Sequence, residues 1–442
     1  MTYQDRLRRL ERAVTATAGG SIRISKGTTS NLFRYQGRQG SADTVISLAD
    51  FNHVISVCDR TRTLDVEGLA TYEQIVEATL PHGLLPTVTP ELKHITIGGA
   101  TVGIGIESSC HRHGFVHDGL IEADVLLPGG RVVTCTADNE HADLFHALPN
   151  SYGSLGYILR ARVELMAARP YVHVRHQRYR DVRSYLEAMR TAVETAEADF
   201  IEGLFHGRDE LYLTRANFVD DAEDADDVYR MIYHRTVRER PDLVLPTRHY
   251  LFRYDPDWFW NVPETPVYNL LRRIAPRRLR SSKFYNRYSA WKHGLLKALK
   301  IPPDRHLEPL IQDWQLPWEE SEAMVHFVLD HVDLNGQPWV ALPVVPRRSP
   351  TLYPVKAGDL YFNLGCYCLT RKPRDDQDYY YTRLVDEECF RRGGLKMLYS
   401  STFLDRQRFD QLYNGAEYAG LKQRFDPDGV APTLFDKAVG GR

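Results

Sequence analysis

The stretch from Thr96 to Gly114, TIGGATVGIGIESSCHRHG, contains the residues best suited to bind a phosphorylated cofactor. Four glycines lie within eight residues, at positions 98, 99, 103 and 105. Glycine has no Cβ, so consecutive backbone amides can be aimed at a ligand there. A bulged strand or a tight turn would explain the same glycines without a ligand.

These glycines do not predict a Rossmann dinucleotide site. That motif must open a helix whose N-terminus receives the pyrophosphate. Here a β-rich lead-in, residues 94–97, precedes the run, and the polar residues 106–114 that follow it lack the apolar period of a helix. We therefore expect a loop cradle in which no helix opens.

A mixture of helices and strands must position this loop. Residues 26–31 form a small hydroxyl-rich segment that could supply a second set of phosphate contacts, although an ordinary turn is the stronger interpretation of this lone signal. The expected elements are helices over 5–14, 71–80 and 182–197, strands over 21–25, 44–48, 63–66, 158–166 and 171–174, and a hairpin over 124–136 around Pro128-Gly129-Gly130.

Length and composition indicate a soluble protein of two domains. The chain has 442 residues, of which 43% are hydrophobic and 26% charged. Arg169-Pro170 is a plausible exit from the first domain. We expect an α+β fold with domains at 1–168 and 169–400, and a C-terminal segment, 401–442, that packs back on the first domain.

Several classes of protein are disfavoured. The net charge of -2 argues against nucleic-acid binding by the whole chain. Six cysteines without a CxxC pair favour a reduced, cytoplasmic setting. No run of eighteen apolar residues predicts a membrane span. His111 and His113 lack a nearby third ligand, so no metal site is expected.

One segment carries a strong local charge. Residues 265–303 contain ten Lys or Arg and no Asp or Glu, with aromatic and leucine residues between them. Over 288–300, Tyr288, Trp291, Leu295 and Leu299 share one helical face, as in a helix at a membrane surface. A basic helix packed on the protein, or single-stranded nucleic acid, would also fit.

The glycine run and its surroundings resemble the Δ24-sterol reductase family of FAD enzymes, within the vanillyl-alcohol oxidase and p-cresol methylhydroxylase (PCMH) superfamily. The likeness reaches nearly the whole chain. It rests on Thr71-Tyr-Glu-Gln-Ile, Gly83 to Leu92, the glycine run, Gly129 to Thr136, Asp143 to Pro149, Ser154-Leu-Gly-Tyr, Phe200-Ile-Glu-Gly-Leu, Pro246 to Tyr250, Leu360 to Gly365 and Met397-Leu-Tyr.

The resemblance implies a PCMH-type FAD-binding domain followed by a substrate domain, and FAD held without a covalent bond, since residues 26–31 offer no His or Cys as a link. The cofactor-binding residues it implies are Thr96, Ile97, Gly98, Gly99, Ala100, Thr101, Val102, Gly103, Ile104, Gly105, Ile106, Glu107 and Ser108, with Gly156 and Ile158.

The resemblance also implies an NADPH-dependent reductase of a lipid C=C bond. The lipid could be a sterol side chain, an isoprenoid or a 10-methylene fatty-acyl chain. Such a reduction needs a positioned acid, and Glu107 and His111 are nearest in sequence. Glu107 could instead cap backbone or pair with an arginine. Arg248, His249, Tyr250, Tyr361 and Tyr367 are the candidate substrate residues, although structural roles would also suit them.

Two rival functions and a localisation complete these expectations. A flavin-dependent alcohol oxidase or dehydrogenase could use the same fold, and a lipid-binding protein could keep the fold without flavin. The animal relatives carry an N-terminal membrane anchor, whereas this chain begins with a polar helix. A cytoplasmic protein that contacts membranes peripherally through 265–303 is therefore expected, and its oligomeric state is left open.

Overall fold

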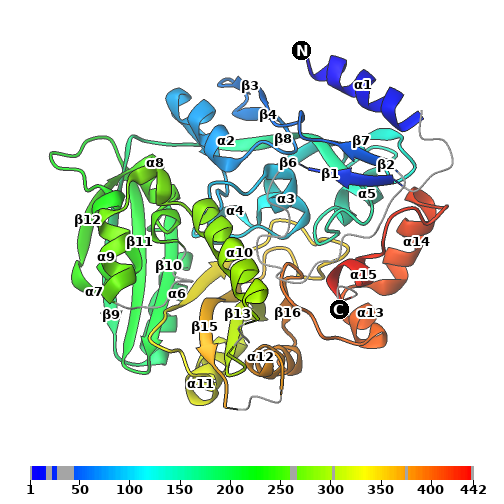
Figure 1. The fold of residues 1–442 in the computed structure, drawn as a ribbon. Coiled ribbons are helices and arrows are strands. Elements are labelled where there is room, and N and C mark those ends of the chain that lie inside the picture. The colour runs from blue at the N-terminus through cyan, green and yellow to red at the C-terminus, as the bar shows by residue number, and fades with distance from the viewer. Residues whose placement is uncertain are drawn as a thin grey trace.

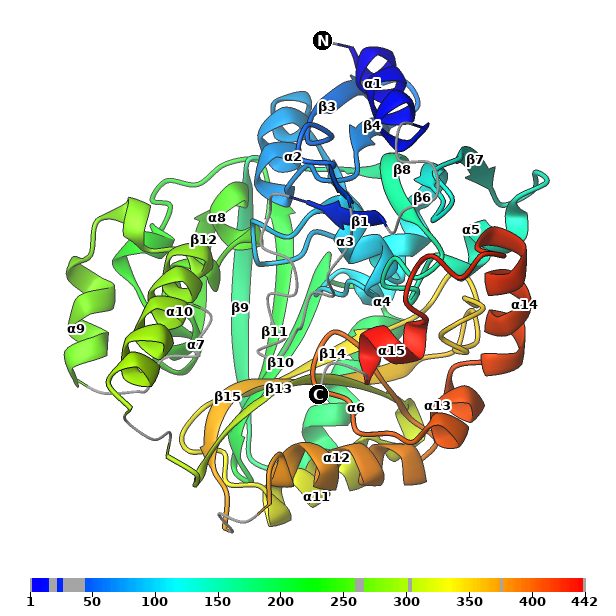
Figure 2. The same cartoon turned by 45° about the vertical axis from the view of Figure 1, so that its right-hand side comes forward.

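Two sheets, one from each half of the chain, make up most of the protein in the computed structural model (Figures 1 and 2). The structure describes residues 2–15, 22–26, 44–258, 266–300, 304–373 and 377–439. Of the hydroxyl-rich segment 26–31, only Lys26 lies among them.

The first sheet has the order β3-β4-β8-β6-β7 and is antiparallel throughout, with β5 paired to β8. A separate parallel pair, β1-β2, lies beside it (Figure 1). The strands are β1 (Ile22–Ser25), β2 (Thr44–Ser47), β3 (Val54–Cys58), β4 (Thr63–Glu67), β5 (Leu84–Pro86), β6 (Leu120–Leu126), β7 (Val132–Thr136) and β8 (Tyr157–Ala167), and the helices are α1 (Tyr3–Thr15), α2 (Tyr72–Thr79), α3 (Ile97–Val102), α4 (Cys110–His113) and α5 (Ala142–Ala147).

Local sequence explains these elements. Thr71 and Gln74 form a capping box at the start of α2, which is the helix expected over 71–80. The turn at Gly129-Gly130 joins β6 to β7, the hairpin expected over 124–136. Glu67 on β4 is fully buried and pairs with Arg6 of α1 at 2.5 Å, which fixes α1 on the sheet.

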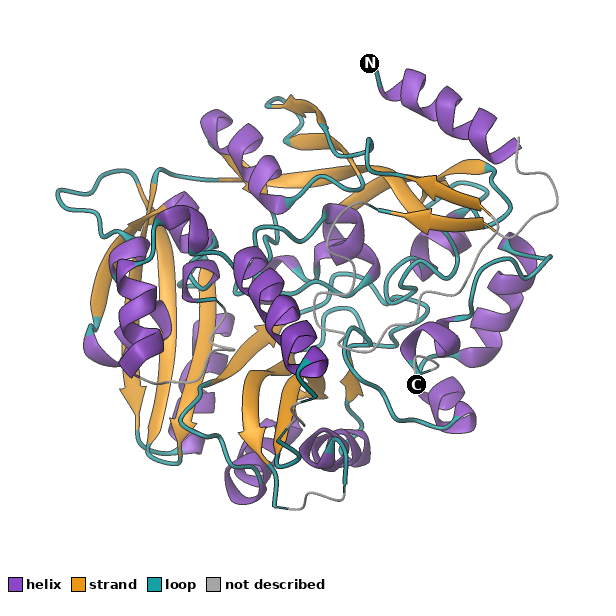
Figure 3. Ribbon diagram, in the orientation of Figure 1, coloured by secondary structure: helices purple, strands orange, loops and turns teal. Residues whose placement is uncertain are grey.

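The second sheet has the order β12-β9-β11-β10-β14-β15-β13-β16 and is also antiparallel. Its strands are β9 (Tyr171–Tyr179), β10 (Phe200–Gly207), β11 (Glu210–Val219), β12 (Asp242–Pro246), β13 (Leu307–Pro317), β14 (Trp339–Val344), β15 (Tyr361–Arg371) and β16 (Leu395–Lys396). Figure 3 shows this sheet with helices packed against it.

The two faces of the second sheet bury different clusters. One face packs under α6 (Val182–Glu194), α11 (Ser321–His331) and α12 (Tyr380–Arg391), around the stacked rings of Trp314 and Trp339. Cys366 and Cys368 are buried on this face as free thiols. The opposite face shares one apolar cluster with the first domain, so the expected boundaries at 168 and 400 stay predictions.

The remaining helices lie at the two sides of the molecule (Figure 2). On the β12 side are α7 (Tyr233–Glu239), α8 (Thr247–Leu251), α9 (Pro266–Ile274) and α10 (Ser282–Ala298), and near the C-terminus are α13 (Arg406–Leu412), α14 (Gly415–Phe425) and α15 (Leu434–Ala438). Arg424 of α14 donates to Asp143 of α5 at 2.5 Å, which ties the C-terminal segment to the first domain. No helix in the described ranges is long and apolar enough to cross a membrane.

One expectation about the glycine run is wrong. A helix does open there: α3 begins at Ile97, with Thr96 as its N-cap and Gly98 and Gly99 inside its first turn. The β-rich lead-in forms no strand, and Thr96 alone makes an isolated bridge to Thr71. Sequence periodicity missed α3 because six residues are too few to show an apolar period.

Candidate active site

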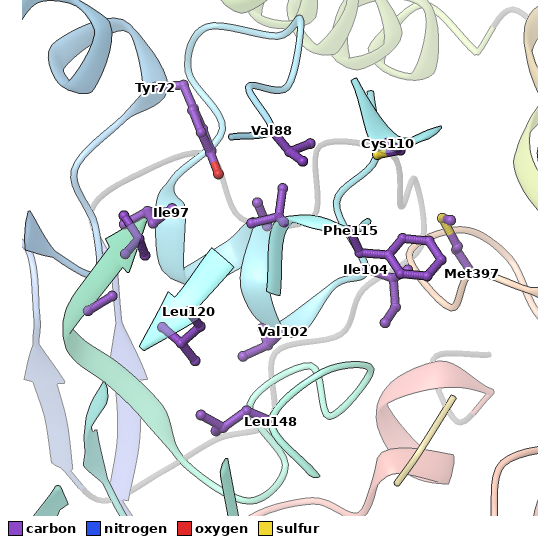
Figure 4. Packing of buried hydrophobic residues seen from close by; sticks show 14 of the residues in the cluster. Tyr72, Val88, Ile97, Val102, Ile104, Cys110, Phe115, Leu120, Leu148 and Met397 are labelled. Atoms are coloured by element: carbon purple, nitrogen blue, oxygen red, sulfur yellow. The ribbon is translucent and has the colours of Figure 1, made fainter. Parts of the chain in front are cut away.

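The segment from Thr96 to Ser108 wraps around the apolar core of the first domain. Ile97 and Val102 point into this core on the side of Leu120 and Leu148, and Ile104 lies beside Phe115 (Figure 4). Within the segment, Gly99, Gly103, Gly105 and Ile106 keep partial exposure. The apolar side chains thus face inward, and the backbone of 103–106 is left to meet a ligand.

Close packing accounts for some of the glycines. A Cβ on Gly98 would lie 2.8 Å from the backbone oxygen of Gly68, and one on Gly105 would lie 2.7 Å from Val116 Cγ2. Ile104, between Gly103 and Gly105, has φ +56°, an uncommon conformation for a β-branched residue. Such strain persists where the surroundings enforce it and is frequent at functional sites.

The same turn has donors to offer a cofactor. Gly105 N–H donates to Ala100 and Val116 N–H donates to Gly105, which hold the turn in place. The N–H groups of Ile104 and Ile106 donate to no acceptor in the described part of the chain. The Ser151 hydroxyl, on the loop that meets α3, is buried and likewise without a partner there. Hydrogen-bond donors without a protein acceptor can donate to the phosphates of FAD, so the residues present fit this cofactor.

Gly156 and Ile158 hold β8 against its neighbours. A Cβ on Gly156 would lie 2.6 Å from Val125 Cγ1, and the Ile158 oxygen passes so near Gly68 that a Cβ there would lie 1.9 Å away. These two residues therefore position the wall behind α3. Their predicted contact with the cofactor stays a prediction.

Glu107, near the end of this segment, belongs to a buried charged cluster between the two domains. Arg253 is 1% exposed and lies 2.5 Å from both Glu91 and Glu202 and 3.9 Å from Glu107. Glu107 accepts from the backbone N–H groups of Glu91, at 3.1 Å, and Ser108, at 3.0 Å. Three carboxyl groups therefore share one guanidinium away from bulk water.

The excess of carboxyl groups over cations favours protonation of this cluster. Burial raises the pKa of Glu107 to about 7, although Arg253 and the Ser108 amide lower it. Burial also raises the pKa of Glu91 well above its usual range, against the opposing effect of Arg253. Because like charges in a dry site cannot all ionise, the cluster keeps a proton near neutral pH. The structure thus gives Glu107 both the backbone-capping role and a means of holding a proton.

A second buried carboxyl group, that of Asp313, lies on the face of the second sheet that carries Glu202. Residues 202 and 313 both project from the sheet face that meets the first domain, by the registers of β10, β14, β15 and β13. Asp313 accepts hydrogen bonds from Tyr367 at 2.5 Å and from Tyr399 at 2.6 Å. Burial raises the pKa of Asp313, and these hydroxyl contacts lower it.

Tyr367 and Tyr399 are more exposed to solvent than the carboxyl group to which they donate. Asp313 is 4% exposed, whereas Tyr367 and Tyr399 are only partly buried, and their hydroxyls lie 3.2 Å apart. Tyr367, one of the expected substrate residues, therefore presents a hydroxyl from the sheet face that meets the first domain. Tyr361, expected beside it, instead accepts from the backbone of Lys356 at 2.9 Å.

His111 joins the domains through its ring. Its Nδ1 lies 3.1 Å from the Ser108 oxygen and its Nε2 lies 3.1 Å from the Ala198 oxygen. Burial lowers the pKa of His111 to about 4, although both carbonyl groups raise it. The neutral ring can donate to one of these oxygens only. This geometry favours a positioning role, and a direct proton role stays a prediction.

The expected substrate residues on α8 separate into different environments. Arg248 is exposed and pairs with Glu77 of α2 at 2.6 Å, and His249 is half-buried, 3.8 Å from Asp227. Tyr250 alone reaches the cluster: it is 1% exposed, its ring lies under the Arg253 guanidinium at 4.6 Å, and its hydroxyl lies 3.5 Å from Ser108 Oγ.

Sequence reasoning missed Glu91, Glu202, Arg253, Asp313 and Tyr399. A signal existed for Glu202, because it is the acidic residue of the mostly apolar strand β10; Asp313 gave none, because β13 also contains Glu308, Gln312 and Gln315. No local pattern links Glu91 to Arg253, which are 162 positions apart in the numbering. Only the fold brings them together.

Comparisons with known proteins give the chain's relatives. A family model described as an FAD binding domain matches residues 13–136. Delta(24)-sterol reductase of Homo sapiens is 26% identical over 416 residues, covering 89% of this chain and 77% of that protein. The protein of the same name from Arabidopsis thaliana is 24% identical over 448 residues, covering 90% and 77%.

A third relative matches a shorter part. Cytokinin dehydrogenase 7 of Oryza sativa subsp. japonica is 33% identical over 144 residues, covering 32% of this chain and 27% of that protein. Together, the fold and these matches identify an α+β flavoprotein of the vanillyl-alcohol oxidase fold with a PCMH-type FAD-binding domain, an FAD-dependent oxidoreductase similar over most of its length to the Δ24-sterol reductases.

Proposed function

We propose that the chain reduces an isolated C=C bond of a lipid, a sterol side chain or a related acyl or isoprenoid chain, with electrons from NADPH. The observation that carries this proposal is the meeting of the cofactor segment with a buried carboxyl cluster, around Glu107, that can hold a proton. When bound, FAD supplies the hydride for one carbon, so the protein must supply a proton for the other.

The chain's own residues divide this work. The turn at 103–106 would hold the cofactor through the amides of Ile104 and Ile106. Glu107 holds a proton near neutral pH and is our proposed acid. Tyr367 and Tyr399, whose hydroxyls both donate to Asp313, would orient the lipid.

The location follows from the substrate. A sterol or acyl chain resides in membranes, so we infer a cytoplasmic protein that takes its substrate at a membrane surface. The similarity to proteins named Delta(24)-sterol reductase supports this substrate class.

Product analysis tests the proposal. The purified protein, supplied with FAD, is incubated anaerobically with NADPH and single unsaturated lipids: a Δ24-unsaturated sterol, a 10-methylene acyl lipid and a polyisoprenoid. We expect a product two hydrogens heavier from one of them, detected by mass spectrometry. An alcohol that reduces the flavin and passes its electrons quickly to oxygen would instead identify an oxidase, and absence of flavin bands after adding FAD would leave a lipid-binding protein.

A further inference from the structure

The helices α9 and α10 expose apolar side chains that most soluble proteins bury. Nine of the twelve large hydrophobic residues that are exposed within the described ranges lie between 267 and 299. On α9, Val267, Leu270, Leu271 and Ile274 share one side of the helix, and Ile274 is 65% exposed. A contiguous patch of this kind marks an interaction surface.

The same pattern continues along α10. Phe284, Tyr288, Trp291, Leu295 and Leu299 recur at intervals of three or four residues, and Trp291 is 63% exposed. The side that could have packed on the protein therefore faces solvent. The alternative interpretation, in which the helix packs through this apolar face onto the protein, does not match the structure.

Charge selects the chemistry of the partner. The stretch 265–303 carries ten basic and no acidic residues. Arg277 is paired with Asp227, but Lys292, Lys297 and Lys300 are exposed and make no ion pair with the residues that the structure describes. Unpaired lysines beside an aromatic and leucine stripe complement the headgroups and acyl boundary of an anionic bilayer.

The helix pair is attached next to the candidate active site. Ser282, at the start of α10, donates its N–H to Asp255, two residues after Arg253, at 3.4 Å. Trp258 stacks on Tyr285 of α10 with ring centroids 5.8 Å apart. Figures 1 and 2 show α10 running along the outside of the second domain from this attachment. A partner surface that binds α10 would therefore lie beside the candidate active site.

We propose that α9 and α10 dock the protein on a bilayer that contains anionic lipid, with the apolar stripes in the acyl boundary and the lysines at the headgroups. The proposal rests on the proposed function for its purpose, since a lipid substrate would enter from the bound leaflet. Its physical basis, the exposed basic and apolar surface, is independent of catalysis.

Vesicle flotation of the FAD-loaded full chain tests this directly. The probes are vesicles of phosphatidylcholine alone and of phosphatidylcholine mixed with phosphatidylglycerol. We expect binding to the mixed vesicles that weakens at high salt. The triple variant Lys292→Glu, Lys297→Glu, Lys300→Glu should bind at least about tenfold less, because each basic residue near the surface contributes to attraction.

Two further variants separate the effect of charge on vesicle binding from the effect of where the charge lies. Arg131→Glu, Arg180→Glu, Lys356→Glu reverses three exposed charges elsewhere and should bind like the parent protein. Ile274→Ser, Trp291→Ser, Leu299→Ser should also lose at least about tenfold in binding through lost apolar burial. Both α9/α10 variants should keep the flavin content and far-UV circular dichroism of the parent.

The outcomes are distinct. Equal flotation of the charge-reversed and control variants, or no flotation of the parent protein, would overturn the proposal. Concentration-dependent dimers that disappear in the Ile274→Ser, Trp291→Ser, Leu299→Ser variant would overturn it in favour of a second copy as the occupant. Vesicle binding without lipid reduction would contradict the proposed activity and leave the docking surface supported.

Discussion

Two regions of this protein reverse the usual distribution of side chains in opposite ways. At the domain interface, Arg253 and three glutamates are withdrawn from water; on α9 and α10, residues such as Ile274 and Trp291 are presented to it. Folding alone favours neither arrangement, because buried charges lose hydration and exposed apolar groups gain nothing. The contrast teaches where to look for function: the interior region can hold a proton, and the exterior region is the surface that we propose for bilayer docking.

The largest expected effect lies in the interior region. Arg253→Met leaves the three carboxyl groups without their cation and should cost about 3–5 kcal/mol of unfolding free energy. Urea unfolding of the flavin-free protein measures it. The control is Arg248→Met, which removes an exposed pair with Glu77 and should cost no more than about 1 kcal/mol. Equal losses for the two variants would show that burial does not distinguish them.

Catalysis should respond to the proton held by Glu107. Glu107→Gln cannot release that proton, so lipid-dependent reoxidation of the reduced protein should slow by about 100-fold while reduction by NADPH changes little. Because the pKa of Glu107 is raised to about 7, the parent rate should fall as pH rises through 7 and the variant rate should stay flat. Stopped-flow traces across pH check this. If reoxidation were unchanged, Tyr367 and Tyr399 would replace Glu107 as the candidate proton donors.

Buried histidine should make the interior sensitive to acid. Burial lowers the pKa of His117 to about 3, and both ring nitrogens lack a partner among the described residues. The unfolded chain takes up that proton near pH 6.5, so stability is lost as pH falls below 6.5. At pH 5 this costs about 2 kcal/mol, since each unit contributes about 1.4 kcal/mol.

His117→Phe removes that acid sensitivity. The ring of His117 already stacks on Phe115 at 5.2 Å, so a phenyl ring suits the site. Urea midpoints of the parent and the variant should diverge between pH 6.5 and 5 and agree in their pH dependence above 7. Parallel curves throughout would contradict a neutral buried His117.

The smallest expected effect lies on the exterior. Leu271→Gln with Ile274→Gln should change the free energy of unfolding by less than about 0.5 kcal/mol, because both side chains are exposed, Leu271 at 42% and Ile274 at 65%. Thermal unfolding measures it. A loss comparable to that of a core substitution would mean that the stripe of α9 packs within the protein, and would remove the contrast between the two regions.

Sequence reasoning reached the elements and one side of the site. Capping at Thr71, the Gly129-Gly130 turn and strand alternation are local signals, so α2, the β6–β7 hairpin and several strands were predictable. The six-residue α3 was not, because its Thr96 cap and glycines read equally well as a loop. Glu107 was found through its place beside the glycines.

The other side of the site depends on sheet register. Glu202 and Asp313 face the cofactor segment only because β10, β14, β15 and β13 pair as they do. Likewise, the basic stretch predicted an amphipathic helix, but whether its apolar face would be packed or exposed depends on what the fold leaves uncovered.

Anaerobic reoxidation tests the central claim most directly. The FAD-loaded protein is reduced with one equivalent of NADPH and mixed with anionic vesicles that contain either a Δ24-unsaturated sterol or its saturated counterpart. The account predicts that the flavin absorbance returns with the unsaturated sterol, or with another unsaturated lipid from the same set, and stays bleached with saturated lipid. A flavin that NADPH does not bleach, or that returns equally with saturated and unsaturated lipid, would contradict it.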